Sequence, residues 1–162
     1  MSIEKAILAA GCFWGVEELI RHLPGVIKTD VGYCGDNKAT ANYSTVKEGE
    51  TEHAEAIMIE FDNHKITCET LIEKFFQLHD PTTKNQQGND IGRQYRSAIF
   101  YADESQKLTA LKVIEKLTAA NKFKKPIVTE VVPVQEFFKA EEYHQDYLQK
   151  NPDGYTCHYW RP

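Results

Sequence analysis

The first apolar stretch of the chain predicts a strand that leads directly into a helix. An uninterrupted apolar run from Ala6 to Ala10 is typical of a buried strand. Beyond Gly15, apolar side chains recur at the i, i+3, i+4, i+7 spacing of one helix face, namely at Val16, Leu19, Ile20 and Leu23. The Pro24-Gly25 pair then predicts the end of this helix.

Later apolar segments predict further strands, over Val26–Tyr33, His53–Phe61, Tyr95–Ala102 and Ile127–Val134. In the second of these, alternation places Glu55 on the same face as three large apolar residues, Ile57, Ile59 and Phe61. Pro133 indicates that the last strand lies at a sheet edge or ends there, because proline cannot donate to the hydrogen-bond ladder.

Helical spacing and caps predict the remaining elements. A second helix runs from an N-cap at Thr67 to His79, with Cys68 as a core residue. Asp103 and Gln106 have the spacing of a capping box and open a third helix. We expect its inward face to be Leu108, Leu111, Ile114 and Leu117. A last short helix is predicted over Lys139–Gln149.

Two polar segments lack apolar periodicity. Thr82–Gly92 is long for a loop inside a compact domain, and such loops are often functional. The tail from Asn151 to Pro162 is predicted to be irregular. The whole pattern favours an α+β fold, in which helices and a mixed β-sheet form a two-layer sandwich with a coil-rich C-terminal segment. We expect residues 1–162 to form a single catalytic domain.

Composition excludes several classes of function. The chain has 162 residues, of which 41% are hydrophobic and 27% charged, as in ordinary soluble globular proteins. A net charge of −5 and a pI near 5.7 argue against nucleic-acid and anionic-membrane partners. No apolar run is long enough to cross a bilayer, and the N-terminus lacks the pattern of a secretory signal. The cysteines form no C-x-x-C pair, which favours reduced thiols in the cytoplasm over a zinc site or a disulfide framework.

The segment Gly11-Cys12-Phe13-Trp14-Gly15 is the strongest candidate for chemistry. It places Cys12 at a helix start, where unpaired backbone N–H groups and the helix dipole stabilise an anion. Cys12 is therefore expected to ionise below the pKa of about 8.5 of a free cysteine. Phe13 and Trp14 are placed to wall a small apolar pocket beside the thiol. The alternative is that Cys12 is a buried small hydrophobic residue without chemistry.

Glu55 is the second candidate, because its face of the strand is otherwise apolar. Burial disfavours a charged carboxylate, so its pKa is expected to be raised. At a frayed strand end the same residue would instead be solvated. Tyr43 and Tyr95 fit ordinary packing, with the ring buried and the hydroxyl at the surface, as well as they fit a catalytic site.

The Gly-Cys-Phe-Trp-Gly segment resembles that of the peptide methionine sulfoxide reductase A family, and the resemblance extends to the C-terminus. Other matching segments are His53-Ala54-Glu55, Gln87-Gly88-Asn89-Asp90 and Gln94-Tyr95-Arg96-Ser97. The family has an α+β sandwich with a coil-rich C-terminal part. The resemblance implies reduction of the S epimer of methionine sulfoxide, protein-bound or free, to methionine, with no cofactor or metal.

The resemblance also assigns roles to individual residues. It implies that Cys12 is the nucleophile and Glu55 the acid, and that Tyr43 and Tyr95 hydrogen-bond the sulfoxide oxygen. It further implies a substrate-binding set beside them, which consists of Phe13, Trp14 and Asp90.

Attack by Cys12 would leave a sulfenic acid, which condenses with a nearby thiol to form a disulfide. Cys157 is the best resolving candidate, since it lies in the tail where many members of the family carry such a cysteine. Cys34, after Tyr33, is either a second resolving thiol or an incidental loop cysteine. The resemblance implies thioredoxin as the reductant of the disulfide. No pattern argues for assembly, so a monomer is expected.

Two rival functions remain at this point. A thiol peroxidase also uses a reactive cysteine with a resolving partner, although it has less use for the Phe13-Trp14 wall. A metal- or partner-binding domain would use the six histidines and scattered cysteines, but none of these have the spacing of a structural zinc site.

Overall fold

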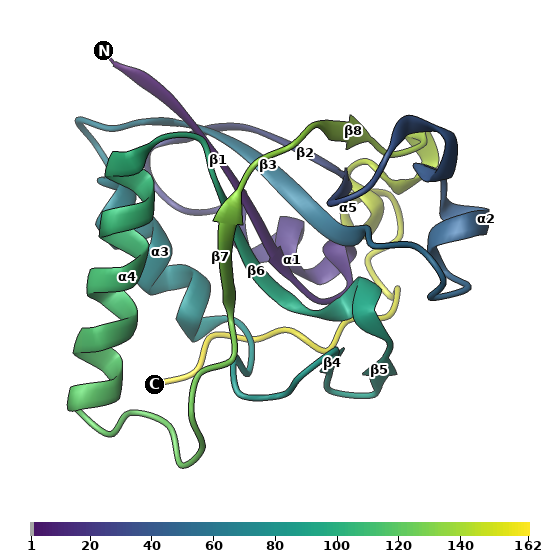
Figure 1. Ribbon diagram of the computed structural model, residues 1–162. Helices are drawn as coiled ribbons and strands as arrows, with labels where there is room; N and C mark the ends of the chain where they lie inside the picture. The colour runs from purple at the N-terminus through teal and green to yellow at the C-terminus, as the bar shows by residue number, and fades with distance from the viewer. Residues whose placement is uncertain (1) are drawn as a thin grey trace.

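In the computed structural model, which describes residues 2–162, a six-stranded mixed sheet carries helices on one face (Figure 1). Its strands are β1 (Ile3–Ala10), β2 (Val26–Cys34), β3 (Ala54–Asp62), β6 (Ser97–Tyr101), β7 (Glu130–Pro133) and β8 (Phe137–Lys139). Across the sheet they follow the order β7-β6-β1-β3-β2-β8. Within residues 2–162, β6 and β7 are the only strands that pair in parallel, and every other pair in this sheet is antiparallel.

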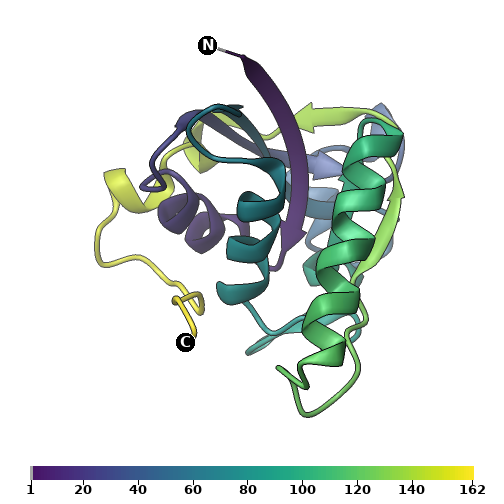
Figure 2. The same cartoon turned by 90° about the vertical axis from the view of Figure 1, so that its left-hand side faces the viewer.

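The long helices pack on one face of this sheet (Figure 2). They are α1 (Phe13–Ile20), α3 (Cys68–Gln77) and α4 (Glu104–Ala119). Shorter elements surround them, namely α2 (Tyr43–Val46), α5 (Tyr147–Lys150), the hairpin β4 (Gln86–Gln87) and β5 (Asp90–Ile91), and 3-10 turns at Lys38–Thr40, Arg93–Tyr95 and Glu142–His144. No helix within residues 2–162 combines the length and the apolar character that a membrane span needs.

The core lies between the sheet and these helices. The predicted apolar face of β3 is fully buried there, at Ile57, Ile59 and Phe61. The predicted N-cap of α3 is confirmed, since the Thr67 hydroxyl oxygen accepts a hydrogen bond from the Thr70 N–H. Cys68 packs against this core, as expected. The alternation of apolar residues therefore correctly identified which strand face is buried.

The opposite face is closed by curling of the sheet itself. β7 and β8 lie at the two ends of the strand order, yet only Val134–Glu136 connect them. A residue spans at most about 3.6 Å and neighbouring strands lie about 4.8 Å apart, so the two ends of the sheet must approach each other. Alanines make room on the inside of this curve, at Ala9, Ala54, Ala56 and Ala98.

One prediction about the helices is wrong in part and another is wrong. Of the expected inward face of α4, Ile114 and Leu117 pack against the core. Leu108 and Leu111 do not, because they are 59% and 43% exposed, and Ala110 and Val113 are buried instead. The expected stripe advanced in steps of three residues, and three such steps turn about 900°, which places Leu108 opposite Leu117. An apolar stripe must alternate steps of three and four to stay on one face.

The predicted helix over Lys139–Gln149 is also wrong, because the segment is split between β8, a 3-10 turn and α5. The Gln145 side chain pairs with both the N–H and the carbonyl of Val31, at 2.9 Å each, as a neighbouring strand would. Asp146 then adopts a left-handed conformation with φ of 55°, which interrupts any helix. Similarly, Tyr95 lies in a 3-10 turn before β6 and not in the strand.

Replacing Gly32 by alanine should destabilise the edge of the sheet. An added Cβ would lie 2.6 Å from Cζ of Phe137 and would collide with the carbonyl oxygen of Phe138 in β8. We expect the free energy of unfolding, measured by urea titration, to fall by roughly 1–3 kcal/mol. Ile27→Ala, at a half-exposed position of the same strand, is the control and should cost about 0.5 kcal/mol or less. An equal loss in both variants would contradict the collision.

Candidate active site

Cys12 lies where β1 turns into α1, as the sequence predicted. It is the N-cap residue of α1. Gly11 makes the turn with φ of 97°, a conformation that favours glycine. A Cβ on Gly11 would also lie 2.7 Å from Cβ of Gln87, so glycine lets the β4–β5 hairpin approach the thiol.

A pocket of about 240 Å³ opens beside this turn. Its lining residues come from six separate parts of the chain and are Cys12, Phe13, Trp14, Tyr43, Glu55, Asp90, Tyr95 and Tyr155. Every predicted site residue except Cys157 is therefore in one pocket. Tyr155 lines it as well, although the sequence alone did not predict it as a site residue.

Glu55 lies on the floor of the site in β3 and is only 2% exposed. Its Oε1 accepts a hydrogen bond of 3.2 Å from the Phe13 N–H at the start of α1. Burial raises the pKa of Glu55 to about 8, in spite of this hydrogen bond, and the nearby charge of Asp90 adds to the increase. The predicted rise is confirmed, and Glu55 holds its proton at neutral pH.

The predicted fall in the pKa of Cys12 is wrong. Cys12 is 9% exposed, and burial raises the pKa of its thiol, with a further contribution from Glu55 once that carboxyl group is ionised at higher pH. The hydrogen bond from the Trp14 N–H opposes this rise but is the smaller effect. The sequence indicated the helix start, whereas the loss of solvent around the sulfur depends on the packing of distant segments.

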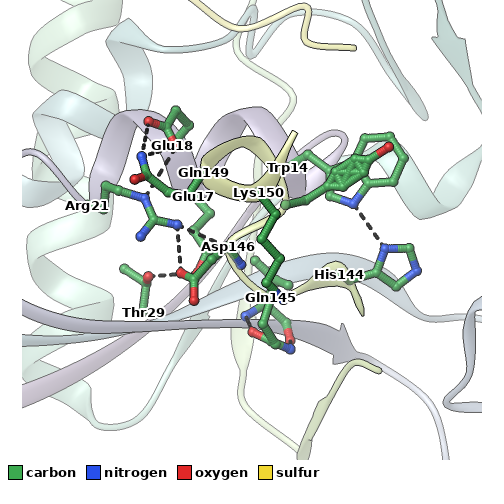
Figure 3. Close-up of polar contacts among 12 residues, drawn as sticks. Trp14, Glu17, Glu18, Arg21, Thr29, His144, Gln145, Asp146, Gln149 and Lys150 are labelled. Carbon is green, nitrogen blue, oxygen red and sulfur yellow. Dashed lines mark hydrogen bonds and ion pairs between the residues drawn. The ribbon is translucent and has the colours of Figure 1, made fainter. Parts of the chain in front are cut away.

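Trp14 packs against the segment that precedes and contains α5 (Figure 3). Its Nε1–H donates to Nδ1 of His144 at 3.0 Å, and its ring stacks on Tyr147 with centroids 3.8 Å apart. The His144 ring also lies against Phe13 and Tyr43, with centroids at 5.2 and 4.6 Å. These contacts fix the aromatic wall of the pocket in one orientation.

A buried carboxyl group on α1 anchors this same segment (Figure 3). Glu17 accepts hydrogen bonds from the Thr29 hydroxyl at 2.7 Å and from the Asp146 N–H at 2.8 Å. The carboxyl of Asp146 in turn accepts from Arg21 at 2.8 Å. The left-handed residue Asp146 is thus tied to the helix that carries Trp14.

Glu141 fixes the position of Tyr43 through hydrogen bonds. One of its oxygens accepts the N–H of Tyr43 at 3.0 Å and the other accepts the hydroxyl of Tyr33 at 2.8 Å. Sequence reasoning missed Glu141, His144 and Tyr147, because their roles depend on contacts with residues about a hundred positions away. The only signal was that acidic and aromatic residues gather in a segment predicted as a short helix.

Cys157 lies just outside the pocket, beside the hairpin. Its Sγ is 3.9 Å from Oδ2 of Asp90, and this oxygen also accepts the Tyr155 hydroxyl at 3.2 Å. Gly88 in the hairpin leaves space for the tail, since a Cβ there would lie 3.4 Å from Cβ of Cys157. Asp90 therefore contacts both the pocket and the tail cysteine.

Cys34 is neither in the pocket nor in a loop. It is the last residue of β2 and is completely buried inside the curled sheet with Ala54 and Ala56. Burial raises the pKa of its thiol to about 11. The structure supports neither expected alternative for Cys34. A second resolving thiol would have to be accessible, and an incidental loop cysteine would have to lie in a loop.

A thiol, a protonated carboxyl group and an aromatic wall around one small pocket define a thiol-dependent enzyme that acts on a small, partly apolar group. Comparison with known proteins identifies the class more closely. The sequence profile described as peptide methionine sulfoxide reductase matches residues 4–162.

Among similar proteins, the peptide methionine sulfoxide reductase MsrA 1 of Mesorhizobium japonicum is 52% identical over 161 residues, covering 99% of this chain and 91% of that protein. MsrA of Streptomyces coelicolor is 54% identical over 159 residues, covering 98% and 90%. The crystal structure of reduced Mxr1 from Saccharomyces cerevisiae matches with a TM-score of 0.93 at 36% identity, covering 99% of this chain and 93% of that one. The chain therefore belongs to the peptide methionine sulfoxide reductase family, and the predicted α+β fold is confirmed.

Proposed function

We propose that this enzyme reduces the S epimer of methionine sulfoxide, in proteins and as the free amino acid, and so repairs proteins under oxidative stress. The observation that supports this most strongly is the single pocket that contains Cys12, the neutral acid Glu55 and the Phe13-Trp14 wall. A sulfoxide combines an apolar methyl group with a strongly hydrogen-bonding oxygen, and this pocket offers a surface for each.

In the proposed first step, the Cys12 sulfur attacks the sulfoxide sulfur. A sulfoxide is a poor electrophile until its oxygen is protonated, and Glu55 with a pKa of about 8 supplies the proton at neutral pH. The hydroxyls of Tyr43 and Tyr95 line the same pocket and stabilise the oxygen as its charge changes. The raised pKa of Cys12 implies that its proton leaves only as attack proceeds, with Glu55 as the acceptor after it has donated its own.

In the proposed second step, Cys157 condenses with the Cys12 sulfenic acid to give a disulfide and water. Thioredoxin then reduces this disulfide by thiol exchange. The support for this partner is a relative, since the solved structures include Mxr1 from Saccharomyces cerevisiae in complex with Trx2, which matches with a TM-score of 0.68 at 25% identity. We further propose that residues 1–162 act as one monomeric domain. We place the enzyme in the reducing cytoplasm, where its four free cysteines would stay reduced.

The separated epimers of a methionine sulfoxide peptide provide the test of this function. With dithiothreitol as reductant, we expect methionine to form from the S epimer at least about 100-fold faster than from the R epimer. With the methyl group on the Trp14 wall, only one configuration directs the oxygen to Glu55 and the sulfur to Cys12. Methionine is quantified by chromatography. Equal rates would contradict the proposed epimer preference, and failure to convert either epimer by folded, reduced protein would contradict the proposed function.

A further inference from the structure

His158, the tail residue after Cys157, has no role in the two proposed steps, although it is buried and makes a defined hydrogen bond. His158 is 7% exposed, and its Nε2 lies 2.6 Å from the carbonyl oxygen of Ala10 at the end of β1. Gly11 and Gly15 provide the space for the ring, since a Cβ on Gly15 would lie 2.6 Å from Nδ1 of His158. The contact joins the C-terminal tail to the strand that ends two residues before Cys12.

This contact fixes the tautomer of His158. A carbonyl oxygen only accepts hydrogen bonds, so Nε2 carries the proton and donates it to Ala10. In a neutral imidazole the other nitrogen, Nδ1, then holds a lone pair. Nδ1 lies 3.8 Å from Sγ of Cys157, within reach of the thiol proton.

A thiol, an imidazole and a group that orients the imidazole form the arrangement that activates nucleophiles in many enzymes. Here Cys157, His158 and the carbonyl of Ala10 occupy these three places. We propose that His158 is a catalytic base of the resolving step, which accepts the Cys157 proton on Nδ1 as Cys157 attacks the sulfenic acid of Cys12. This inference rests on the proposed function, which supplies that sulfenic acid.

The reaction balances without an added oxidant. The S–H bond of Cys157 breaks, its proton moves to Nδ1, and the electron pair left on its sulfur forms the bond to the Cys12 sulfur. The S–O bond of Cys12 breaks, and the leaving hydroxide takes a proton from Glu55 to become water. The imidazolium then returns its proton through solvent to Glu55, so the sum is one thiol and one sulfenic acid giving one disulfide and one water.

The groups around His158 make a lasting imidazolium charge unfavourable, so the ring can hold an accepted proton only briefly. Burial lowers the pKa of His158 to about 4, and Arg161 in the tail contributes to the decrease. His79, at the end of α3, is a further titratable neighbour and is itself kept neutral by burial. The imidazole is therefore neutral at neutral pH, so the Nδ1 lone pair is unprotonated, and it holds the Cys157 proton only while the new sulfur–sulfur bond forms.

Asp90 is the competing base. Its Oδ2 lies 3.9 Å from Sγ of Cys157, but it already accepts the hydroxyl of Tyr155. The lone pair on Nδ1 of His158 has no other hydrogen-bond donor among the described contacts, which favours His158 as the acceptor.

The test separates the reduction of substrate from the formation of the disulfide. Protein is mixed with excess methionine sulfoxide peptide and no reductant, and both the methionine released and the free thiols are followed in time. His158→Gln retains an N–H that reaches the Ala10 carbonyl but lacks a basic nitrogen, whereas His158→Ala lacks both. His22→Gln, at an exposed histidine after α1, is the matched control.

We expect His158→Gln to release one methionine at the wild-type rate but to form the disulfide about 100-fold more slowly. Between about pH 5.5 and 7.5 the wild-type rate should be nearly constant, because His158 stays neutral above about pH 4. The rate in His158→Gln should instead rise about tenfold per pH unit, since it then follows the small thiolate fraction of Cys157. Turnover supported by dithiothreitol should remain at the wild-type value in the His22→Gln control, whose side chain is exposed and outside the site.

Each contrary result has one meaning. If His158→Gln forms the disulfide at the wild-type rate and only His158→Ala is slow, His158 only holds the tail in place. The proposal that His158 is the base is then overturned, and Asp90 takes that role. If wild-type protein releases no methionine, the proposed function itself fails. If Cys157→Ser still loses two thiols per turnover, another cysteine resolves the sulfenic acid and the second step of the proposed function is wrong.

Discussion

Replacing Cys12 by serine should lower the rate of methionine formation by at least roughly 10⁴-fold. A serine hydroxyl is a far weaker nucleophile than a thiol, and it cannot form a sulfur–oxygen species that a second thiol resolves. The change replaces only the sulfur by an oxygen at a buried position at the start of α1, so the fold should remain. The rate is measured with the S epimer of a methionine sulfoxide peptide and dithiothreitol.

The matched control is Cys68→Ser. Cys68 is the first residue of α3, packs against the main core and does not line the pocket, so its thiol should not affect turnover. Circular dichroism and urea unfolding of both variants verify that the proteins are folded. Substantial activity in Cys12→Ser would transfer the role of nucleophile to another thiol.

Replacing Glu55 by glutamine should have two opposite effects, on activity and on stability. Glutamine cannot protonate the sulfoxide oxygen, so we expect the rate of methionine release in a single turnover to fall by about 10²- to 10⁴-fold. In the wild type this rate should decline as the pH rises above about 8, where Glu55 loses its proton. The variant should lack this decline.

The stability effect follows from the raised pKa of the same carboxyl group. In the folded protein its pKa is about 8 instead of 4.5, so between these values the folded state binds more protons than the unfolded state. The wild-type free energy of unfolding therefore falls as the pH rises through this window, by at most about 1.4 kcal/mol per pH unit. Glutamine has no proton to lose, so the variant should become progressively more stable than the wild type between about pH 5 and pH 8.

Urea titrations at several pH values measure this difference. Glu60→Gln provides the control, because Glu60 lies on the same strand, partly exposed and outside the pocket. It should change neither the single-turnover rate nor the pH dependence of stability. A constant difference in stability between Glu55→Gln and wild type at all pH values would show that Glu55 is ionised in the folded protein, and would remove its role as the acid.

Ionisation of Glu55 lowers the stability of the fold, which is consistent with a residue kept for catalysis and not for stability. Glu55 is buried beside the Phe13 N–H with no cation among its described hydrogen-bond or ion-pair partners. Such a carboxyl group stays neutral because ionisation in low dielectric surroundings is costly. The same absence of a cation keeps the proton available for transfer.

The amino-acid sequence alone was sufficient for the elements that depend on local patterns. The strand before Gly11, the helix after Cys12, the N-cap at Thr67 and the buried face of β3 all follow from periodicity and capping. The edge position of the strand with Pro133 was also correct, because a missing N–H restricts where a residue can pair. These features involve interactions between residues close in sequence, which a single chain displays directly.

Tertiary structure decided whatever depends on solvent exclusion and on distant partners. The sequence placed Cys12 at a helix start, but burial by other segments reverses the direction of its pKa shift. His144, Glu141 and Tyr155 support or line the pocket through contacts with residues far away in the chain. The physical reason is that desolvation and side-chain packing are properties of the folded surface, whereas helix starts and strand faces are properties of the local backbone.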